Sequence, residues 1–207
     1  MKLQIALDTL SLEECIALLD ETKEYVDVIE VGTPFIIEEG MRPVRELKKR
    51  YPQLEVLADT KIMDAGDLEA ECAFRNGADI VTVLGASNDA TILGSIEAAK
   101  RWNGKVMVDM IAVKDIAART KEVDAMGVDY ICCHTAFDVQ NTGKNPLSEL
   151  MIINQNIKHA KSAVAGGVKL ETIDAIVQEG AAIVVVGGAI SNAEDRAAMA
   201  KAMKARI

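Results

Sequence analysis

A chain of 207 residues, half of them hydrophobic, is long enough for one well-cored domain and leaves little room for a second. Its net charge of −9, with no basic block longer than the "KKR" at residues 48–50, argues against nucleic acid or an anionic membrane surface as a partner. No apolar run approaches the length of about 20 residues that a membrane span needs, and no signal peptide is evident, so we expect a soluble cytoplasmic protein.

Short apolar runs that end in a polar residue or a glycine recur along the whole chain, and each is predicted to be a β-strand. The eight runs cover residues 3–8, 26–32, 55–61, 79–85, 105–111, 129–134, 161–167 and 182–188. Their nearly continuous hydrophobicity is typical of parallel strands that are covered on both faces. Between the runs, apolar residues recur every three or four positions, which predicts helices.

Capping signals mark the boundaries of several of these helices. Ser11 with Glu14, and Ser191 with Glu194, each fit a capping box, which predicts a helix start at both places. Glycines at positions 77, 127 and 180 follow helical segments and predict helix ends.

The repeated alternation of strand and helix points to a barrel. Eight units in this length give about 26 residues per unit, close to the minimum for one βα unit of a (β/α)8 barrel. We therefore predict an α/β fold in which residues 1–207 form a single (β/α)8 TIM barrel domain. A doubly wound open sheet is the alternative, but no G-x-G-x-x-G motif follows the first strand.

Active sites of such barrels lie at the C-terminal ends of the strands, so the polar residues and glycines found there are the candidates for function. In chain order they are Asp8, Glu30, Asp59 with Lys61, Asp109, His134, the pair Gly166 and Gly167, and the pair Gly187 and Gly188.

The acidic candidates indicate a metal. Because side chains alternate along a strand, Asp59 and Lys61 should face the barrel mouth together. Four carboxylates that converge there would raise one another's pKa unless cations offset their charge. Lys61 supplies one cation, and a divalent metal is the natural second. Oxygen ligands without thiolate or clustered imidazole favour Mg²⁺, with Mn²⁺ as a close substitute.

The remaining candidates suggest a phosphorylated substrate and a proton carrier. Paired glycines after the seventh and eighth strands are typical of barrels that bind phosphate through backbone N–H groups. His134 is the only histidine at a strand end and is a candidate general acid or base. Lys61 should stay protonated among carboxylates, which makes it a fixed positive charge and a poor Schiff-base nucleophile.

The order of these residues resembles the orotidine 5′-monophosphate decarboxylase suprafamily, whose most specific mark is the D-x-K-x-x-D motif formed by Asp59, Lys61 and Asp64. Within it, segments such as "LQIALDTLSLEE" and "LADTKIMDAG" resemble the 3-hexulose-6-phosphate synthases from end to end. The related 3-keto-L-gulonate-6-phosphate decarboxylases typically have Glu, Arg and Thr at three positions where this chain departs. The departures, which favour the synthases, are Asp109, Phe137 and Ala165.

The resemblance implies a Mg²⁺-dependent aldol condensation of formaldehyde with D-ribulose 5-phosphate that passes through an enediolate. We hypothesise that Glu30 and Asp59 ligate Mg²⁺, that Lys61 stabilises the enediolate and that His134 moves the proton. The paired glycines would anchor the phosphate of the sugar.

Other roles complete the hypothesis. Asp8 and Asp109 are expected to position hydroxyl groups and Lys61. By resemblance, Asp64 reaches into the site of a second subunit, which implies a homodimer. Two alternatives stay open, namely a sugar-phosphate decarboxylase or epimerase that uses the same metal and phosphate devices, and a non-catalytic sugar-phosphate-binding barrel.

Overall fold

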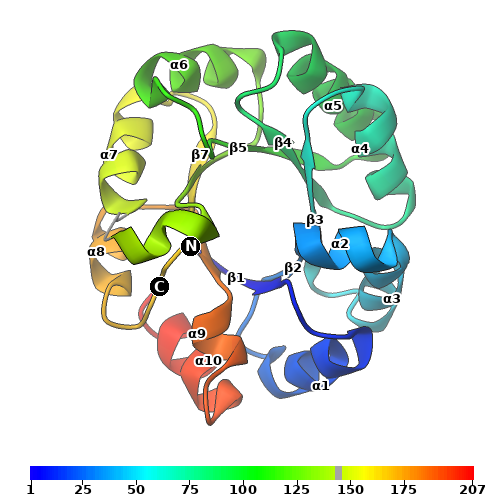
Figure 1. The fold of residues 1–207 in the computed structure, drawn as a ribbon, viewed down its shortest axis with the longest axis vertical. Helices are drawn as coiled ribbons and strands as arrows, with labels where there is room; N and C mark the ends of the chain where they lie inside the picture. The colour runs from blue at the N-terminus through cyan, green and yellow to red at the C-terminus, as the bar shows by residue number, and fades with distance from the viewer. Residues whose placement is uncertain (143–145) are drawn as a thin grey trace.

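Parallel strands pair in chain order and close on themselves in the computed structural model, which describes residues 1–142 and 146–207 (Figure 1). Closure is complete because β1 pairs with both β2 and β8. Within the described residues the strands are β1 (Lys2–Leu7), β2 (Val28–Val31), β3 (Glu55–Ile62), β4 (Ile80–Leu84), β5 (Lys105–Asp109), β6 (Tyr130–His134), β7 (Lys161–Ala165) and β8 (Ile183–Val186). The predicted (β/α)8 barrel is therefore confirmed, and the open sheet is excluded.

Helices form a ring outside the strands (Figure 1). They are α1 (Leu12–Thr22), α2 (Thr33–Glu39), α3 (Arg42–Arg50), α4 (Gly66–Arg75), α5 (Asp89–Trp102), α6 (Ile116–Met126), α7 (Pro146–Asn156), α8 (Ile173–Gln178), α9 (Gly188–Ser191) and α10 (Arg196–Lys204), with a 3₁₀-helix, η1 (Phe137–Thr142), before α7. None of the helices in the described part of the chain is long and apolar enough to cross a membrane.

One of the two predicted capping boxes is confirmed and the other is wrong. Ser11 accepts a hydrogen bond from the Glu14 backbone, and the Glu14 side chain accepts one from the Ser11 backbone, so α1 begins as predicted. Ser191 instead ends the one-turn helix α9, because the backbone already turns helical directly after Gly187. The next helix, α10, is capped by Asp195, whose carboxylate accepts from the backbone N–H of Ala198.

The core has two parts that match the two faces of the barrel wall. The larger part packs the outward side chains of the strands against the helices. The smaller part fills the barrel interior with Val28, Leu57, Ile80, Met107, Tyr130, Cys132, Ala163, Ala165, Ile183 and Val185. This apolar interior forms a floor, and the charged residues at the strand ends lie against it.

The opposite, N-terminal end of the barrel is held by a repeated contact that we call the aspartate staple, formed by Asp27, Asp79 and Asp129. Each stands just before an even-numbered strand, and its carboxylate accepts from a backbone N–H of the preceding strand. The bonds run from Leu3 to Asp27 (2.7 Å), from Val56 to Asp79 (2.7 Å) and from Val106 to Asp129 (2.9 Å). The backbone N–H of each aspartate donates to the carbonyl of the same strand residue, and its carbonyl accepts from the following strand.

Candidate active site

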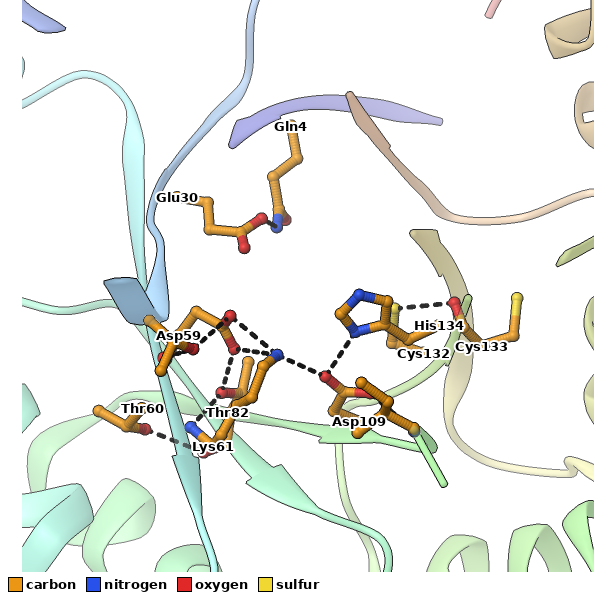
Figure 2. A network of polar contacts seen from close by, with 12 residues as sticks. Gln4, Glu30, Asp59, Thr60, Lys61, Thr82, Asp109, Cys132, Cys133 and His134 are labelled. Carbon is orange, nitrogen blue, oxygen red and sulfur yellow. Dashed lines mark hydrogen bonds and ion pairs between the residues drawn. The ribbon is translucent and has the colours of Figure 1, made fainter. Parts of the chain in front are cut away.

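A pocket opens at the C-terminal end of the barrel, over the apolar floor. Five of the candidates from the sequence line it: Glu30, Asp59, Lys61, Asp109 and His134. They come from β2, β3, β5 and β6, and Figure 2 shows their polar ends turned toward one another. Gln4, Thr82 and Ala165 line the same pocket.

Lys61 reaches the pocket through an irregularity in β3. Pairing of β3 with β4 runs from Ala58 opposite Val81 to Ile62 opposite Val83, so β3 takes four steps where β4 takes two. Lys61 lies in this bulge with a φ of 45°, a left-handed conformation that is unusual for a residue with a side chain. Asp59 and Lys61 do line one pocket as predicted, but simple alternation along a regular strand is not the reason.

The Lys61 ammonium is held between two carboxylates. Its Nζ lies 2.9 Å from Oδ2 of Asp59 and 2.8 Å from Oδ2 of Asp109. Burial by itself would lower the pKa of Lys61, but the charges of Asp59 and Asp109 outweigh burial and raise the pKa well above its ordinary value. Lys61 is therefore a fixed positive charge that is aimed into the pocket.

Asp109 joins Lys61 to His134. Its Oδ2 contacts the Lys61 Nζ and lies 2.8 Å from Nδ1 of His134, while its Oδ1 accepts from the backbone N–H of Ile111. Burial alone would raise the pKa of Asp109, but the hydrogen bond from His134 and the nearby charges lower it to about 2. A neutral His134 that donates from Nδ1 to this carboxylate keeps Nε2 as a proton acceptor (Figure 2).

Asp59 is buried and fixed by two threonine hydroxyls. Thr82 donates to its Oδ1 at 2.7 Å, and the Thr33 hydroxyl lies 2.9 Å from its Oδ2. Neither threonine was a candidate from the sequence. The signal for Thr82 was a lone polar residue in the apolar run of β4, which places it on a strand but says nothing about what it contacts.

Glu30 lies beside Gln4 at the edge of the floor. The Gln4 Nε2 donates to Oε2 of Glu30 at 2.6 Å. Burial, followed by the charge of Asp59, raises the pKa of Glu30 to about 8. Gln4 was also missed, although a glutamine within the run of β1 was a visible exception to its hydrophobicity. Its Oε1 is buried and has no hydrogen-bond partner among the described residues.

The donor set fits a hard divalent cation. In residues 1–142 and 146–207, no group of three or more His, Cys, Asp or Glu side chains is placed so that the group could hold a metal ion. Mg²⁺ usually takes only one or two carboxylates and completes its shell with water and substrate. Glu30 and Asp59 supply two buried carboxylates whose mutual repulsion contributes to the raised pKa of Glu30, and a cation would relieve it.

Asp8 and Asp64 lie apart from the lining of the pocket. Asp8 follows β1, and its side chain is exposed at the rim close to Gly32, where a Cβ on that glycine would lie 2.0 Å from Oδ1 of Asp8. Asp64 is exposed in the turn after β3 and accepts from the backbone N–H of Ala65. The described structure therefore does not bring Asp64 into the pocket of its own chain.

The glycine pairs follow the adjacent strands β7 and β8. Gly166 and Gly167 have φ values of 91° and 70°, and a Cβ on Gly166 would lie 2.2 Å from the carbonyl oxygen of Thr135. Only glycine fits this close backbone approach. Gly187 caps the start of α9, whose first residue is Gly188.

Comparison with known proteins gives a consistent result over the length of the chain. The model of the orotidine 5′-phosphate decarboxylase / HUMPS family matches residues 1–203. The 3-hexulose-6-phosphate synthase of Bacillus subtilis (strain 168) is 53% identical over 207 residues, which are 100% of this chain and 99% of that protein.

Solved structures agree with this result. A crystal structure of 3-hexulose-6-phosphate synthase from Salmonella typhimurium has a TM-score of 0.97 and 42% identity, covering 99% of this chain and 97% of that chain. A crystal structure of 3-keto-L-gulonate-6-phosphate decarboxylase from Vibrio cholerae O1 biovar El Tor has a TM-score of 0.86 and 27% identity, covering 99% and 96%.

Proposed function

Because the chain belongs to the orotidine 5′-phosphate decarboxylase / HUMPS family, we propose that it is an aldehyde-lyase that catalyses the 3-hexulose-6-phosphate synthase reaction. This reaction is the reversible aldol condensation of formaldehyde with D-ribulose 5-phosphate to D-arabino-hex-3-ulose 6-phosphate. The geometric observation that carries the proposal is the Lys61 ammonium, held charged by Asp59 and Asp109 and facing a pocket that also contains His134.

Mg²⁺, with Mn²⁺ as a substitute, would be held by Glu30 and Asp59. When bound, this ion adds positive charge that stabilises the negative oxygens of an enediolate. All other parts of the mechanism fall to side chains and backbone groups of this chain.

His134 is the proton carrier in this proposal. Its Nε2 takes a proton from carbon 1 of ribulose 5-phosphate, and Asp109 stabilises the resulting imidazolium through Nδ1. Lys61 places its positive charge beside the enediolate that forms. Carbon 1 then attacks the carbon of formaldehyde, and the new alkoxide oxygen takes a proton back from His134, which restores the starting state of the enzyme.

The rest of the site binds and orients the sugar. Backbone N–H groups at Gly166 and Gly167, and at Gly187 and Gly188, would anchor the phosphate, because glycine lets the backbone approach an anion closely. Asp8, exposed at the rim, would accept a hydrogen bond from a sugar hydroxyl. The phosphate and the reacting carbon thus meet opposite sides of the barrel mouth.

A homodimer completes the proposal. Asp64 is exposed and lies outside the pocket of its own chain, as a residue that serves a neighbouring subunit would. Exposed apolar side chains on either side of this turn, Met63 and Leu68, provide surface that a second copy can cover.

The direct test is formaldehyde consumption in the presence of ribulose 5-phosphate, measured with Mg²⁺ and again after chelation. Activity that requires the metal supports the proposal, and no consumption with the metal contradicts it.

An assay with 3-keto-L-gulonate 6-phosphate in parallel tests the alternative that the chain is a decarboxylase. Ala165 at the pocket wall and the exposed Phe137 in η1 stand where the decarboxylases typically have Thr and Arg, and they favour the synthase.

Lys61→Ala tests the chemistry. The variant removes the cation that Asp59 and Asp109 share, so circular dichroism must first show that it folds, and the folded variant should lose solvent deuterium exchange at carbon 1 of ribulose 5-phosphate. Loss of the fixed positive charge leaves the enediolate without its partner. Mass spectrometry of the recovered sugar phosphate measures the exchange. Exchange at the wild-type rate in the variant would contradict the role of Lys61 in stabilising the enediolate.

A further inference from the structure

We propose that Thr82 is a positioning residue whose single hydroxyl fixes both Asp59 and the bulge that carries Lys61. The inference rests on the proposed function, because it concerns the same site, and it adds a residue from β4, a strand that supplied no candidate in the sequence. Figure 2 shows Thr82 between the two residues that it serves.

The hydroxyl of Thr82 makes two contacts, which use its single hydrogen and one of its two lone pairs. It donates to Oδ1 of Asp59 at 2.7 Å and accepts from the backbone N–H of Lys61 at 2.9 Å. The direction of each bond is fixed, because an ionised carboxylate can only accept and a backbone N–H can only donate. Thr82 is only 4% exposed, so water has little access to take over either contact.

The bulge explains why a side chain accepts the hydrogen bond from the Lys61 backbone. Where β3 takes two more steps than β4, the regular ladder between the strands is interrupted, and at this point the Lys61 N–H donates to a side-chain acceptor, the Thr82 hydroxyl. This hydroxyl therefore supports the left-handed backbone at Lys61, which in turn sends the lysine side chain back toward Asp59.

A neighbouring threonine provides a matched control. The Thr60 hydroxyl donates to the backbone carbonyl of Thr82 at 2.9 Å and so bridges β3 and β4 within the same bulge. Its hydroxyl bonds to the Thr82 backbone and not to Asp59 or to the Lys61 ammonium. Thr60→Val removes one bond from the bulge, whereas Thr82→Val removes both the bond to the Lys61 backbone and the bond that orients the Asp59 carboxylate.

The predicted effects separate positioning from simple support of the fold. Thr82→Val should lower kcat by about 10- to 100-fold and weaken Mn²⁺ binding to the substrate-free protein by a similar factor, as losses of groups that orient metal ligands do. Thr82→Ser, which keeps the hydroxyl, should restore most of both. Thr60→Val should change either quantity by less than about 3-fold.

The experiment uses the full chain. Titration calorimetry with Mn²⁺ alone measures binding, steady-state kinetics measure kcat and KM, and thermal melts followed by circular dichroism measure folding. If Thr82→Val does not fold, Thr82→Ala and Thr82→Ser replace it, because both lose the methyl group and only one loses the hydroxyl. Wild-type kcat and Mn²⁺ affinity in the variant that lacks the hydroxyl would overturn the proposal, as would equal losses in Thr60→Val.

These readouts also keep the two proposals apart. A wild-type protein that does not consume formaldehyde contradicts the proposed function, while the Mn²⁺ titrations of the variants still decide the role of Thr82. An active wild-type protein with an equally active Thr82→Val variant contradicts the role of Thr82 alone.

Discussion

Asp109 links the two groups of the site that carry or gain positive charge, Lys61 and His134. One of its oxygens contacts both the Lys61 ammonium and the His134 imidazole, at 2.8 Å each. A carboxylate can serve both partners because it only accepts hydrogen bonds and carries the charge that both need. A single side chain, that of Asp109, therefore holds both His134, the proton carrier, and Lys61, the fixed cation, in position.

Replacing Asp109 by Asn should uncouple these two groups while the shape of the site is kept. The amide carries no charge and must present a donor to one of its partners, so we expect kcat to fall by about 100-fold or more. Steady-state kinetics at saturating ribulose 5-phosphate measure the loss. Asp109→Glu, which keeps the charge, is the matched variant and should retain more activity. An Asn variant that is as active as the wild type contradicts the role of the carboxylate.

At the scale of elements, the strands were predictable and the bulge was not. Each strand is an apolar run that is buried on both faces, and this composition identifies it without knowledge of its neighbours. The bulge at Lys61 depends on how β3 is registered against β4, which is a relation between two distant segments. Thr82 and Gln4 were missed for the same reason, since their roles come from partners on the neighbouring strands, which are more than 20 residues away in the sequence. The prediction of a capping box at Ser191 was wrong because Asp195, four residues further on, caps the next helix instead.

Helix α6 and the segment just before β7 are joined by one buried carboxylate, that of Asp124. It accepts from three successive backbone N–H groups, those of Lys158 (3.0 Å), His159 (3.0 Å) and Ala160 (2.7 Å). Burial by itself would raise the pKa of Asp124, but the three hydrogen bonds outweigh it and lower the pKa below its ordinary value of 3.8.

This shift predicts how stability depends on pH. Because the pKa of Asp124 is lower in the folded state than in the unfolded one, its contribution is complete above the ordinary value of 3.8 and is lost as pH falls through the folded value. Asp124→Asn should lower the free energy of unfolding at neutral pH by about 2 kcal/mol, and the difference from wild type should shrink in acid. Urea unfolding of the variant and the wild type at neutral and at acid pH measures this difference.

A surface variant on the same helix controls for the change of net charge. Glu122 is exposed and pairs with Arg119, so Glu122→Gln should change the free energy of unfolding by less than about 0.5 kcal/mol. A difference between Asp124→Asn and wild type that stays constant from neutral to acid pH would show that the charge of Asp124 plays no part.

At the scale of the whole molecule, the proposed dimer can be tested by mixing inactive variants. Lys61→Ala and Asp64→Asn should each have little activity alone. If Asp64 serves the partner's site, a mixed dimer has one site in which both residues are intact. Random mixing makes half of the dimers mixed, so the mixture should recover about a quarter of wild-type activity.

Co-refolding of equal amounts of the two variants, followed by the formaldehyde assay, measures this recovery. Sedimentation of the same samples reports whether dimers form. A mixture whose activity equals the mean of its two parents, in a sample that is dimeric, contradicts a shared site.

The aspartate staple indicates which junction between strands opens first when the barrel unfolds. The position before β8 that corresponds to the three aspartates is Ala182, whose N–H donates to Ser162 and whose carbonyl accepts from Lys2. Alanine has no carboxylate for the N–H of Ser162. The same junction also has the shortest register, with two paired positions between β7 and β8. Ala182→Asp should therefore slow hydrogen exchange at Ser162 and raise the free energy of unfolding by about 1 kcal/mol.

A closed barrel has no edge strands, so it offers no unpaired row of backbone groups to another chain. Such an edge appears only where the ring first separates. Among the four junctions that join an odd-numbered strand to the next strand, three have the staple carboxylate and the junction of β7 with β8 does not. Resistance to aggregation is thus expected to depend on the N-terminal end of this junction, which lies at the end of the barrel opposite the pocket.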